Sequence, residues 1–204
     1  MTVAICESGG MLYAHRQRGA AGLATAILTL VSITGCGSAE SGVTPTTYPQ
    51  LRAALVGSPP SLAATHLLMG KVTTSPEPSF TKTLKSLRGF PIVVNTWASW
   101  CGPCRYEFPI FGQASLKLGK RVGFLGIATR DPASDARQFL AGHPVGYPSW
   151  ADPDGGLAAS AGVGAGLPVT TIYDRNGRRS YIHQGPYRTV AALEADLARY
   201  GGLK

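Results

Sequence analysis

Two cysteines, Cys101 and Cys104, have the spacing in this chain that most directly indicates chemistry. An apolar run at residues 92–94 precedes them and is typical of a buried strand, whereas apolar residues recur at helical spacing after Gly102. The chain therefore passes from strand to helix at the cysteines, which places Cys101 at the helix N-terminus. Because Cys104 follows within one helical turn, the two sulfur atoms can close a disulfide.

The position of Cys101 predicts a nucleophilic thiolate. The unpaired N–H groups and the dipole at a helix N-terminus stabilise the negative charge of a deprotonated cysteine. Cys104 would then resolve a mixed disulfide formed on Cys101. Two other interpretations are half of a zinc site and an inert structural disulfide. The first lacks partners, since Cys6 and Cys36 are isolated and there is no second C-x-x-C, and the second would restrain only a very short loop.

The residues around the cysteines resemble the thioredoxin superfamily. The segment W-x-x-W-C-G-P-C, which begins at Trp97, is typical of thioredoxin folds, and the wider V-N-x-W-A-S-W-C-G-P-C-R-x-E-x-P resembles the membrane-tethered, extracytoplasmic TlpA/ResA-like branch. The resemblance extends from about residue 87 to residue 200. It implies an α/β thioredoxin fold, in which helices flank a central mixed β-sheet. It also implies a strand–helix insertion between the catalytic helix and a strand that begins at a cis-proline.

The same resemblance implies a role for a carboxyl group. Thioredoxin has a buried Asp six residues before its first cysteine, but this chain has Asn95, which cannot take up a proton. Glu107 lies three residues after Cys104, where the branch carries its characteristic acid, and would tune the buried thiol or relay its proton. The alternative for Glu107 is a solvated helix carboxylate.

Pro168 stands directly before a β-branched run, residues 169–173, that predicts a central strand. A proline lacks the N–H that a ladder needs, but it is tolerated at the start of a strand. The resemblance implies a cis-proline that faces the C-x-x-C and leaves the Leu167 backbone free to pair with an extended substrate; the alternative is a trans turn proline. The expected substrate-binding residues are Trp97, Trp100, Gly102, Pro103, Leu167 and Pro168.

The N-terminal region predicts export. Arg16 and Arg18 precede an uncharged apolar run at residues 19–33, and the segment Ile-Thr-Gly-Cys that ends at Cys36 resembles a bacterial lipobox. This implies lipidation of Cys36 and cleavage before it, so that the protein is anchored as a lipoprotein on the outer face of the bacterial cytoplasmic membrane. An uncleaved signal anchor is the alternative, although the run is shorter than the roughly 20 residues of a membrane span. Either form exports the domain to a compartment where disulfides persist.

With 204 residues, of which 44% are hydrophobic, the chain is expected to form one globular domain behind a leader. We expect a signal peptide at 1–35, a flexible tether at 36–47, a helical segment at 48–70 and a thioredoxin-like domain at 71–204. Translation from Met11 in place of Met1 stays an open alternative, in which case Cys6 is not translated.

The elements expected around the site follow from apolar periodicity and turn residues. Asp131 is expected to be the N-cap of a helix that ends at Gly142. The other expected elements are helices at 48–56 and 61–69, a loop or small strand pair at 80–87, strands at 121–129 and 145–150, a short helix at 157–161, strands at 169–173 and 179–183 joined by a turn at 174–177, and a last helix capped by Thr189.

The net charge of +8 comes from scattered basic residues, with short clusters only at 120–121 and 178–179. Such a surface attracts anionic lipid headgroups, but no aromatic stacking platform accompanies it, so we expect no nucleic-acid partner. We expect a monomer, and neither a cofactor nor a metal.

Together these features predict a membrane-tethered thiol–disulfide oxidoreductase that reduces disulfides of exported proteins. The resemblance implies that electrons come from a membrane thiol-electron donor and that the protein substrates include apocytochrome c. Two alternatives stay open: an oxidase that forms disulfides, and a tethered interaction module without enzyme activity.

Overall fold

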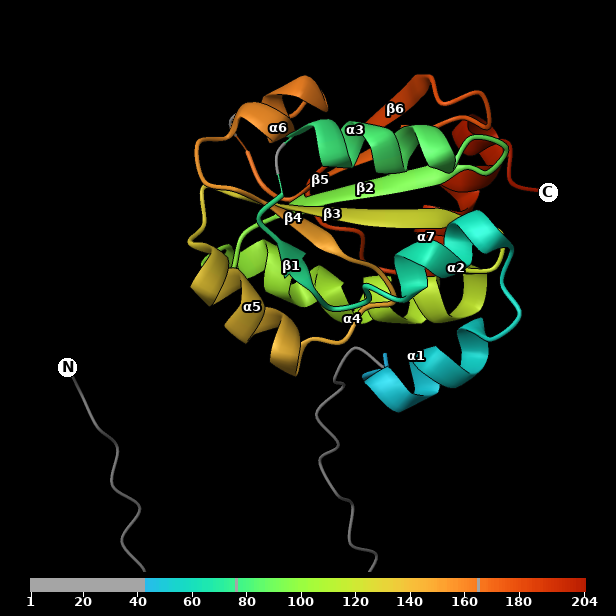
Figure 1. The fold of residues 1–204 in the computed structure, drawn as a ribbon, viewed down its shortest axis with the longest axis horizontal. Coiled ribbons are helices and arrows are strands. Elements are labelled where there is room, and N and C mark those ends of the chain that lie inside the picture. Colours follow the sequence, from blue (N-terminus) through green and yellow to red (C-terminus); the bar gives the residue numbers. More distant parts are fainter. Residues whose placement is uncertain (1–42, 76, 165) are drawn as a thin grey trace, which may run out of the picture. The chain divides into compact units, whose positions relative to one another are not determined.

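The computed structural model describes residues 43–75, 77–164 and 166–204 (Figure 1). The predicted signal peptide, the lipobox cysteine Cys36 and most of the predicted tether lie outside these residues. Within them, no helix is long and apolar enough to cross a membrane.

A six-stranded mixed sheet has the order β1-β4-β3-β2-β5-β6. The first four strands of this order run parallel to one another, whereas β5 runs antiparallel to both β2 and β6. The expected thioredoxin fold with a central mixed sheet is therefore confirmed. The strands are β1 (Val72–Thr73), β2 (Ile92–Trp97), β3 (Gly123–Thr129), β4 (Ser149–Asp152), β5 (Val169–Tyr173) and β6 (Arg179–Gln184).

Helices cover both faces of the sheet, with α3 and α6 on one face and α4 and α5 on the other (Figure 1). The helices are α1 (Tyr48–Leu55), α2 (Pro60–His66), α3 (Glu77–Ser86), α4 (Gly102–Leu118), α5 (Ala133–Gly142), α6 (Gly156–Ser160) and α7 (Val190–Asp196), which continues as the π-helical turn Leu197–Gly201. The expected strand–helix insertion is confirmed, because β4 and α6 lie between α4 and β5 along the chain.

Strand β2 is buried along its whole length and contributes to two apolar clusters. Val93 and Trp97 belong to the cluster that includes residues of α4, whereas Ile92 and Val94 belong to the cluster that includes residues of α3 and α6. A strand covered on both faces reads as a continuous apolar run, which is why the sequence locates it so well. Its C-terminal end leads directly to Cys101.

Two expectations for local structure are wrong. Residues 80–87 were expected to form a loop or strand pair, but most of them belong to α3. Asp131 is not a helix N-cap: Pro132 holds that position without a side-chain cap, and the Asp131 carboxylate accepts hydrogen bonds from Ser99 instead. The helix expected at 48–56 is confirmed as α1, where Thr47 and Gln50 form a capping box.

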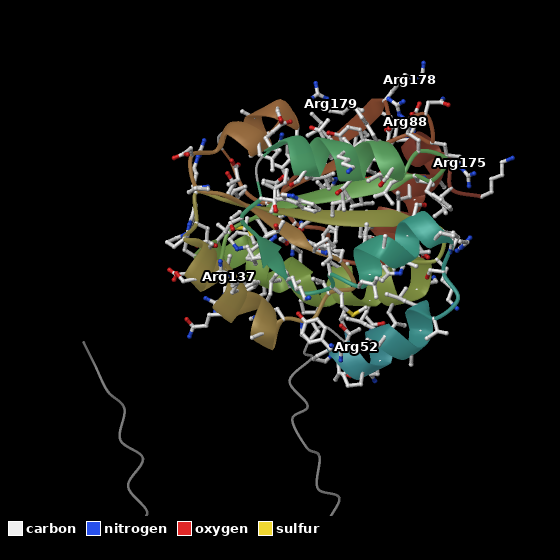
Figure 2. All side chains as sticks on the ribbon, viewed as in Figure 1. Arg52, Arg88, Arg137, Arg175, Arg178 and Arg179 are labelled. Atoms are coloured by element: carbon white, nitrogen blue, oxygen red, sulfur yellow. A yellow bond between two sulfur atoms is a disulfide. The ribbon has the colours of Figure 1, made fainter. Side chains whose placement is uncertain are left out.

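The basic residues are less scattered than the sequence indicates. Arg88 packs over the β5–β6 turn, where a Cβ at Gly177 would lie 3.1 Å from Arg88 Nε. Figure 2 shows Arg88, Arg175, Arg178 and Arg179 near this end of the β5–β6 hairpin, with Arg52 at the opposite side of the view.

Candidate active site

Cys101 and Cys104 form a disulfide at the start of α4, with Cα atoms 5.3 Å apart. Cys101 is the N-cap residue, and its Sγ accepts a hydrogen bond of 3.2 Å from the Cys104 N–H. In the reduced protein the same N–H and the helix dipole favour a thiolate on Cys101. Cys101 is 4% exposed and Cys104 is fully buried, so Cys101 is the sulfur that an incoming disulfide can reach.

The Leu167–Pro168 peptide bond is cis, as the resemblance implies, and the trans alternative is wrong. Val169 pairs with Thr96 in the antiparallel register of β5 and β2. Pro168 therefore lies at the end of β2 from which the chain runs to Cys101. Leu167 packs against the same apolar cluster that contains both cysteines.

The predicted substrate-binding residues divide into exposed and buried ones. Trp100 is 60% exposed, and its Nε1–H donates to the Arg130 carbonyl at 2.9 Å. Gly102 and Pro103 are exposed as well. Trp97 is fully buried, with Nε1–H donating to Ser149 Oγ at 3.2 Å. The expectation that Trp97 contacts substrate is therefore wrong, since its ring supports the site from within the core.

Glu107 is fully buried on α4, so the alternative of a solvated carboxylate is wrong. Its Oε1 accepts a hydrogen bond of 2.6 Å from Asn95 Nδ2, and its Oε2 accepts one of 3.3 Å from the Tyr187 N–H. Burial raises the pKa of Glu107 to about 8, against the lowering effect of these two hydrogen bonds. The group can therefore hold or release a proton close to neutral pH.

The loop after β3 positions the residues just before Cys101, which the sequence did not indicate. Asp131 is 1% exposed and accepts from the Ser99 N–H at 2.6 Å and from Ser99 Oγ at 2.8 Å. The preceding Arg130, whose φ is 51°, accepts the hydrogen bond of Trp100. The only sequence signal at this place was Asp-Pro, which indicates a helix start and does not indicate a contact between Asp131 and Ser99.

Two other features of the site come from the structure alone. Tyr106, one turn into α4, is 83% exposed and adds a second aromatic ring beside the cysteines in sequence. Tyr187 reaches Glu107 from 80 positions away, and no sequence pattern relates the two. Among the described residues, no group of three or more His, Cys, Asp or Glu side chains could hold a metal ion.

A mixed sheet, a cis-proline at the start of an antiparallel central strand and a C-x-x-C at a helix N-terminus define the class of thioredoxin-fold proteins with a dithiol–disulfide centre. Residues 68–197 match the Redoxin family. The chain therefore belongs to the redoxin family.

Named relatives agree with this assignment. The chain is 40% identical over 95 residues to a thiol:disulfide interchange protein DsbE homolog of Paracoccus denitrificans (strain Pd 1222), covering 46% of this chain and 50% of the relative. It is 37% identical over 126 residues to DsbE of Pseudomonas fluorescens biotype C, covering 60% and 67%. The matches thus span about half to two thirds of these relatives.

A solved structure gives the same result. A secreted Mycobacterium tuberculosis disulfide oxidoreductase, described as homologous to Escherichia coli DsbE, superposes with a TM-score of 0.50 at 26% identity, covering 56% of this chain and 85% of the other. The resemblance to the thioredoxin superfamily and its TlpA/ResA-like branch is thereby confirmed.

Proposed function

We propose that the protein is a thiol–disulfide oxidoreductase that cycles Cys101 and Cys104 between dithiol and disulfide. The observation that carries this proposal is the disulfide at the N-terminus of α4, with the outer sulfur on Cys101 and the inner one buried. The name shared by the relatives, thiol:disulfide interchange protein, supports it.

The reaction follows from the positions of the two sulfur atoms. The Cys101 thiolate attacks one sulfur of a substrate disulfide, the other substrate sulfur leaves as a thiolate, and a mixed disulfide forms. Cys104, deprotonated, then attacks Cys101 Sγ and releases the second substrate thiol. Two electrons pass from the dithiol to the substrate, and the protein is left with the Cys101–Cys104 disulfide.

Glu107 acts on the second step of this cycle. It lies one helical turn beyond Cys104, and its raised pKa of about 8 lets it exchange a proton in the pH range in which thiols titrate. We assign it the role of taking up the Cys104 proton when this thiol attacks. Asn95 and the Tyr187 N–H position the carboxyl group for that role.

A protein substrate docks on the exposed residues around Cys101. Trp100, Gly102 and Pro103 form one side of this surface, and the Leu167–Pro168 segment forms the other. An extended substrate strand can pair with the Leu167 backbone, which brings its disulfide to Cys101.

The direction proposed is reduction of exported proteins. One helix N-terminus without a histidine in the motif stabilises the Cys101 thiolate only moderately, and a moderately stabilised dithiol donates its electrons. The family resemblance supports a membrane thiol-electron donor and substrates that include apocytochrome c.

Insulin reduction tests the activity. With dithiothreitol as reductant, the protein is expected to shorten the lag before insulin B chains precipitate. The control is the same protein reduced and then alkylated on its thiols, which should give the lag of dithiothreitol alone. An interaction module without redox activity would show no difference between the two samples.

The anchor is a separate part of the proposal, and it rests on the lipobox at Cys36 together with the secreted relative. In this arrangement residues 1–35 are removed, the chain after Cys36 tethers the protein, and the helical segment 48–70 precedes the thioredoxin-like domain at 71–204. The last part of the expected tether is not free, because Thr46 is buried and its Oγ1 donates to the Pro144 carbonyl at 3.1 Å. Cys36→Ser is expected to leave the precursor unprocessed or to release the protein from membranes, whereas Cys6→Ser changes neither. Mass spectrometry that finds an unlipidated Cys36 in the mature protein would contradict the anchor.

A further inference from the structure

Exposed apolar side chains gather in two regions of the described chain. Trp100, which belongs to the proposed docking surface, and Tyr106 flank the cysteines in sequence. The other large exposed apolar side chains lie near the C-terminal ends of α1 and α2, where Val56 is 71%, Leu67 80% and Leu68 42% exposed. The redox reaction gives no reason for this second group.

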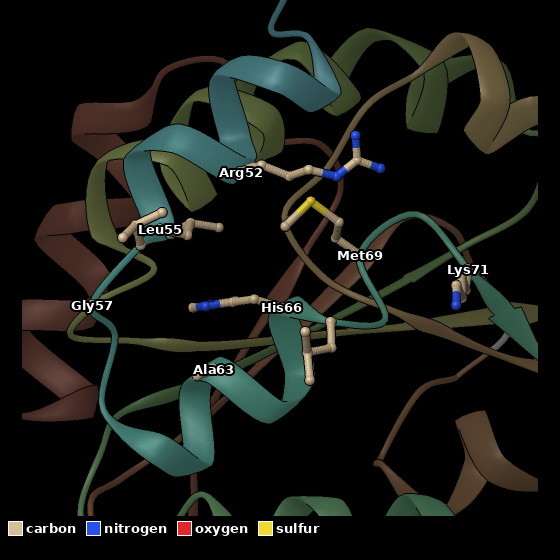
Figure 3. A pocket seen from close by; sticks show the side chains of 9 residues that line it. Arg52, Leu55, Gly57, Ala63, His66, Met69 and Lys71 are labelled. Carbon is tan, nitrogen blue, oxygen red and sulfur yellow. The ribbon is translucent and has the colours of Figure 1, made fainter.

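A pocket of about 430 Å³ lies at these residues, between α1 and α2 (Figure 3). This volume falls within the range of about 300–1,000 Å³ that is usual for small-molecule sites. Its apolar side chains come from Leu55, Val56, Ala63, Leu67 and Met69, and its basic ones from Arg52, His66 and Lys71. No carboxylate is among the lining residues.

The pocket is built into the fold. Gly57 turns the chain between the two helices with a φ of 76°, and Leu55 is only 5% exposed. Gly119, at the end of α4, lies against two of the lining side chains, because a Cβ there would lie 2.5 Å from Leu55 Cδ2 and 3.5 Å from His66 Nε2. Leu55 and His66 are therefore packed against the rest of the domain.

The charges around the pocket favour an anion. Arg52 and Lys71 are exposed cations among the lining residues, and Figure 3 shows the Arg52 side chain extending past Met69 while His66 lies in the space between the helices. Burial lowers the pKa of His66, and its Nδ1 is buried without a hydrogen-bond partner. Apolar walls beside two cations suit a ligand that has both an aliphatic chain and a negative group.

We propose that the α1–α2 pocket binds a single-chain amphiphile with an anionic head, of the class of the medium-chain aliphatic carboxylates. The aliphatic chain lies against Leu55, Leu67 and Met69, and the carboxylate lies towards Arg52 and Lys71. The proposal does not depend on the redox function, because none of these residues belongs to the proposed active site.

Photolabelling of the full chain tests the proposal. A 12-carbon carboxylate with a diazirine on its chain is crosslinked at submicellar concentration, and the labelled peptides are identified by mass spectrometry. Label is expected in residues 52–71 and should be displaced by excess dodecanoate. The double variant Arg52→Glu/Lys71→Glu should lower the labelling at least about tenfold. Lys85→Glu/Arg175→Glu changes two exposed cations that do not line the pocket and should not lower it.

Three results would overturn the proposal: equal labelling by a 12-carbon trimethylammonium probe, label spread over the chain without enrichment in residues 52–71, or label unaffected by the charge reversal. The first two results would mean that the apolar residues of the α1–α2 pocket do not bind an anionic amphiphile. Leu67→Asp is a second variant that removes an apolar contact, and because Leu67 is 80% exposed the fold should tolerate it. Insulin reduction, measured on every variant, should be unchanged and shows that the domain is folded.

Discussion

Replacing Cys104 with serine is expected to accumulate mixed disulfides on Cys101, whereas replacing Cys101 with serine accumulates none. The buried Cys104 is the group that releases the substrate, so its loss halts the cycle after the first attack. Loss of Cys101 prevents that attack. Each change should lower insulin reduction by roughly a thousandfold or more, because the remaining thiol cannot complete the exchange.

Nonreducing electrophoresis followed by mass spectrometry measures the trapped species. The matched control is the double variant Cys101→Ser/Cys104→Ser, which keeps Cys36 and should trap nothing. Trapping through Cys104 in the Cys101→Ser protein would reverse the assignment of the two sulfurs. Identification of the trapped proteins also shows whether apocytochrome c is a substrate.

Glu107→Gln is expected to remove a pH dependence of stability. The pKa of Glu107 is about 8 in the folded protein against an ordinary 4.5. Between these pH values the folded state binds the extra proton, so the free energy of unfolding is highest below pH 4.5 and falls until about pH 8. The rise of the Glu107 pKa from 4.5 to about 8 corresponds to a total change in the free energy of unfolding of about 5 kcal/mol.

Urea unfolding of the oxidised protein at pH 5 and pH 9 gives the measurement. Wild type should lose several kcal/mol more than Glu107→Gln between the two, up to the same figure of about 5 kcal/mol. Glu194→Gln is the matched control, since Glu194 pairs with the exposed Lys117 and should alter the difference by less than about 1 kcal/mol. Equal pH dependence in wild type and Glu107→Gln would show that folding does not raise the pKa of the Glu107 carboxyl group.

The sequence predicts those parts of the site that depend on local order. A strand buried on both faces and a helix start lie within residues 92–109, so Cys101 and Cys104 could be found from local order, whereas the role of Glu107 came from the family resemblance. The cis bond at Pro168 came from the family resemblance. Nothing in local periodicity alone would have distinguished it from a turn proline.

Contacts between distant segments were not predictable in this way. Ser99 and Asp131 are 32 positions apart, and Glu107 and Tyr187 are 80 apart, so no spacing relates them. Trp97 was expected among the substrate-binding residues. Its burial follows instead from its place on β2, where it shares the face of Val93.

The equilibrium of the Cys101–Cys104 pair with glutathione or dithiothreitol tests the central claim most directly. The fraction of disulfide, followed by thiol alkylation and mass shift, gives the reduction potential of the pair. A reductant of exported proteins predicts a value of about −200 to −300 mV, the range of reducing thioredoxin-type proteins. A value near about −120 mV, typical of a strong oxidant, would contradict the proposed direction and identify an enzyme that forms disulfides.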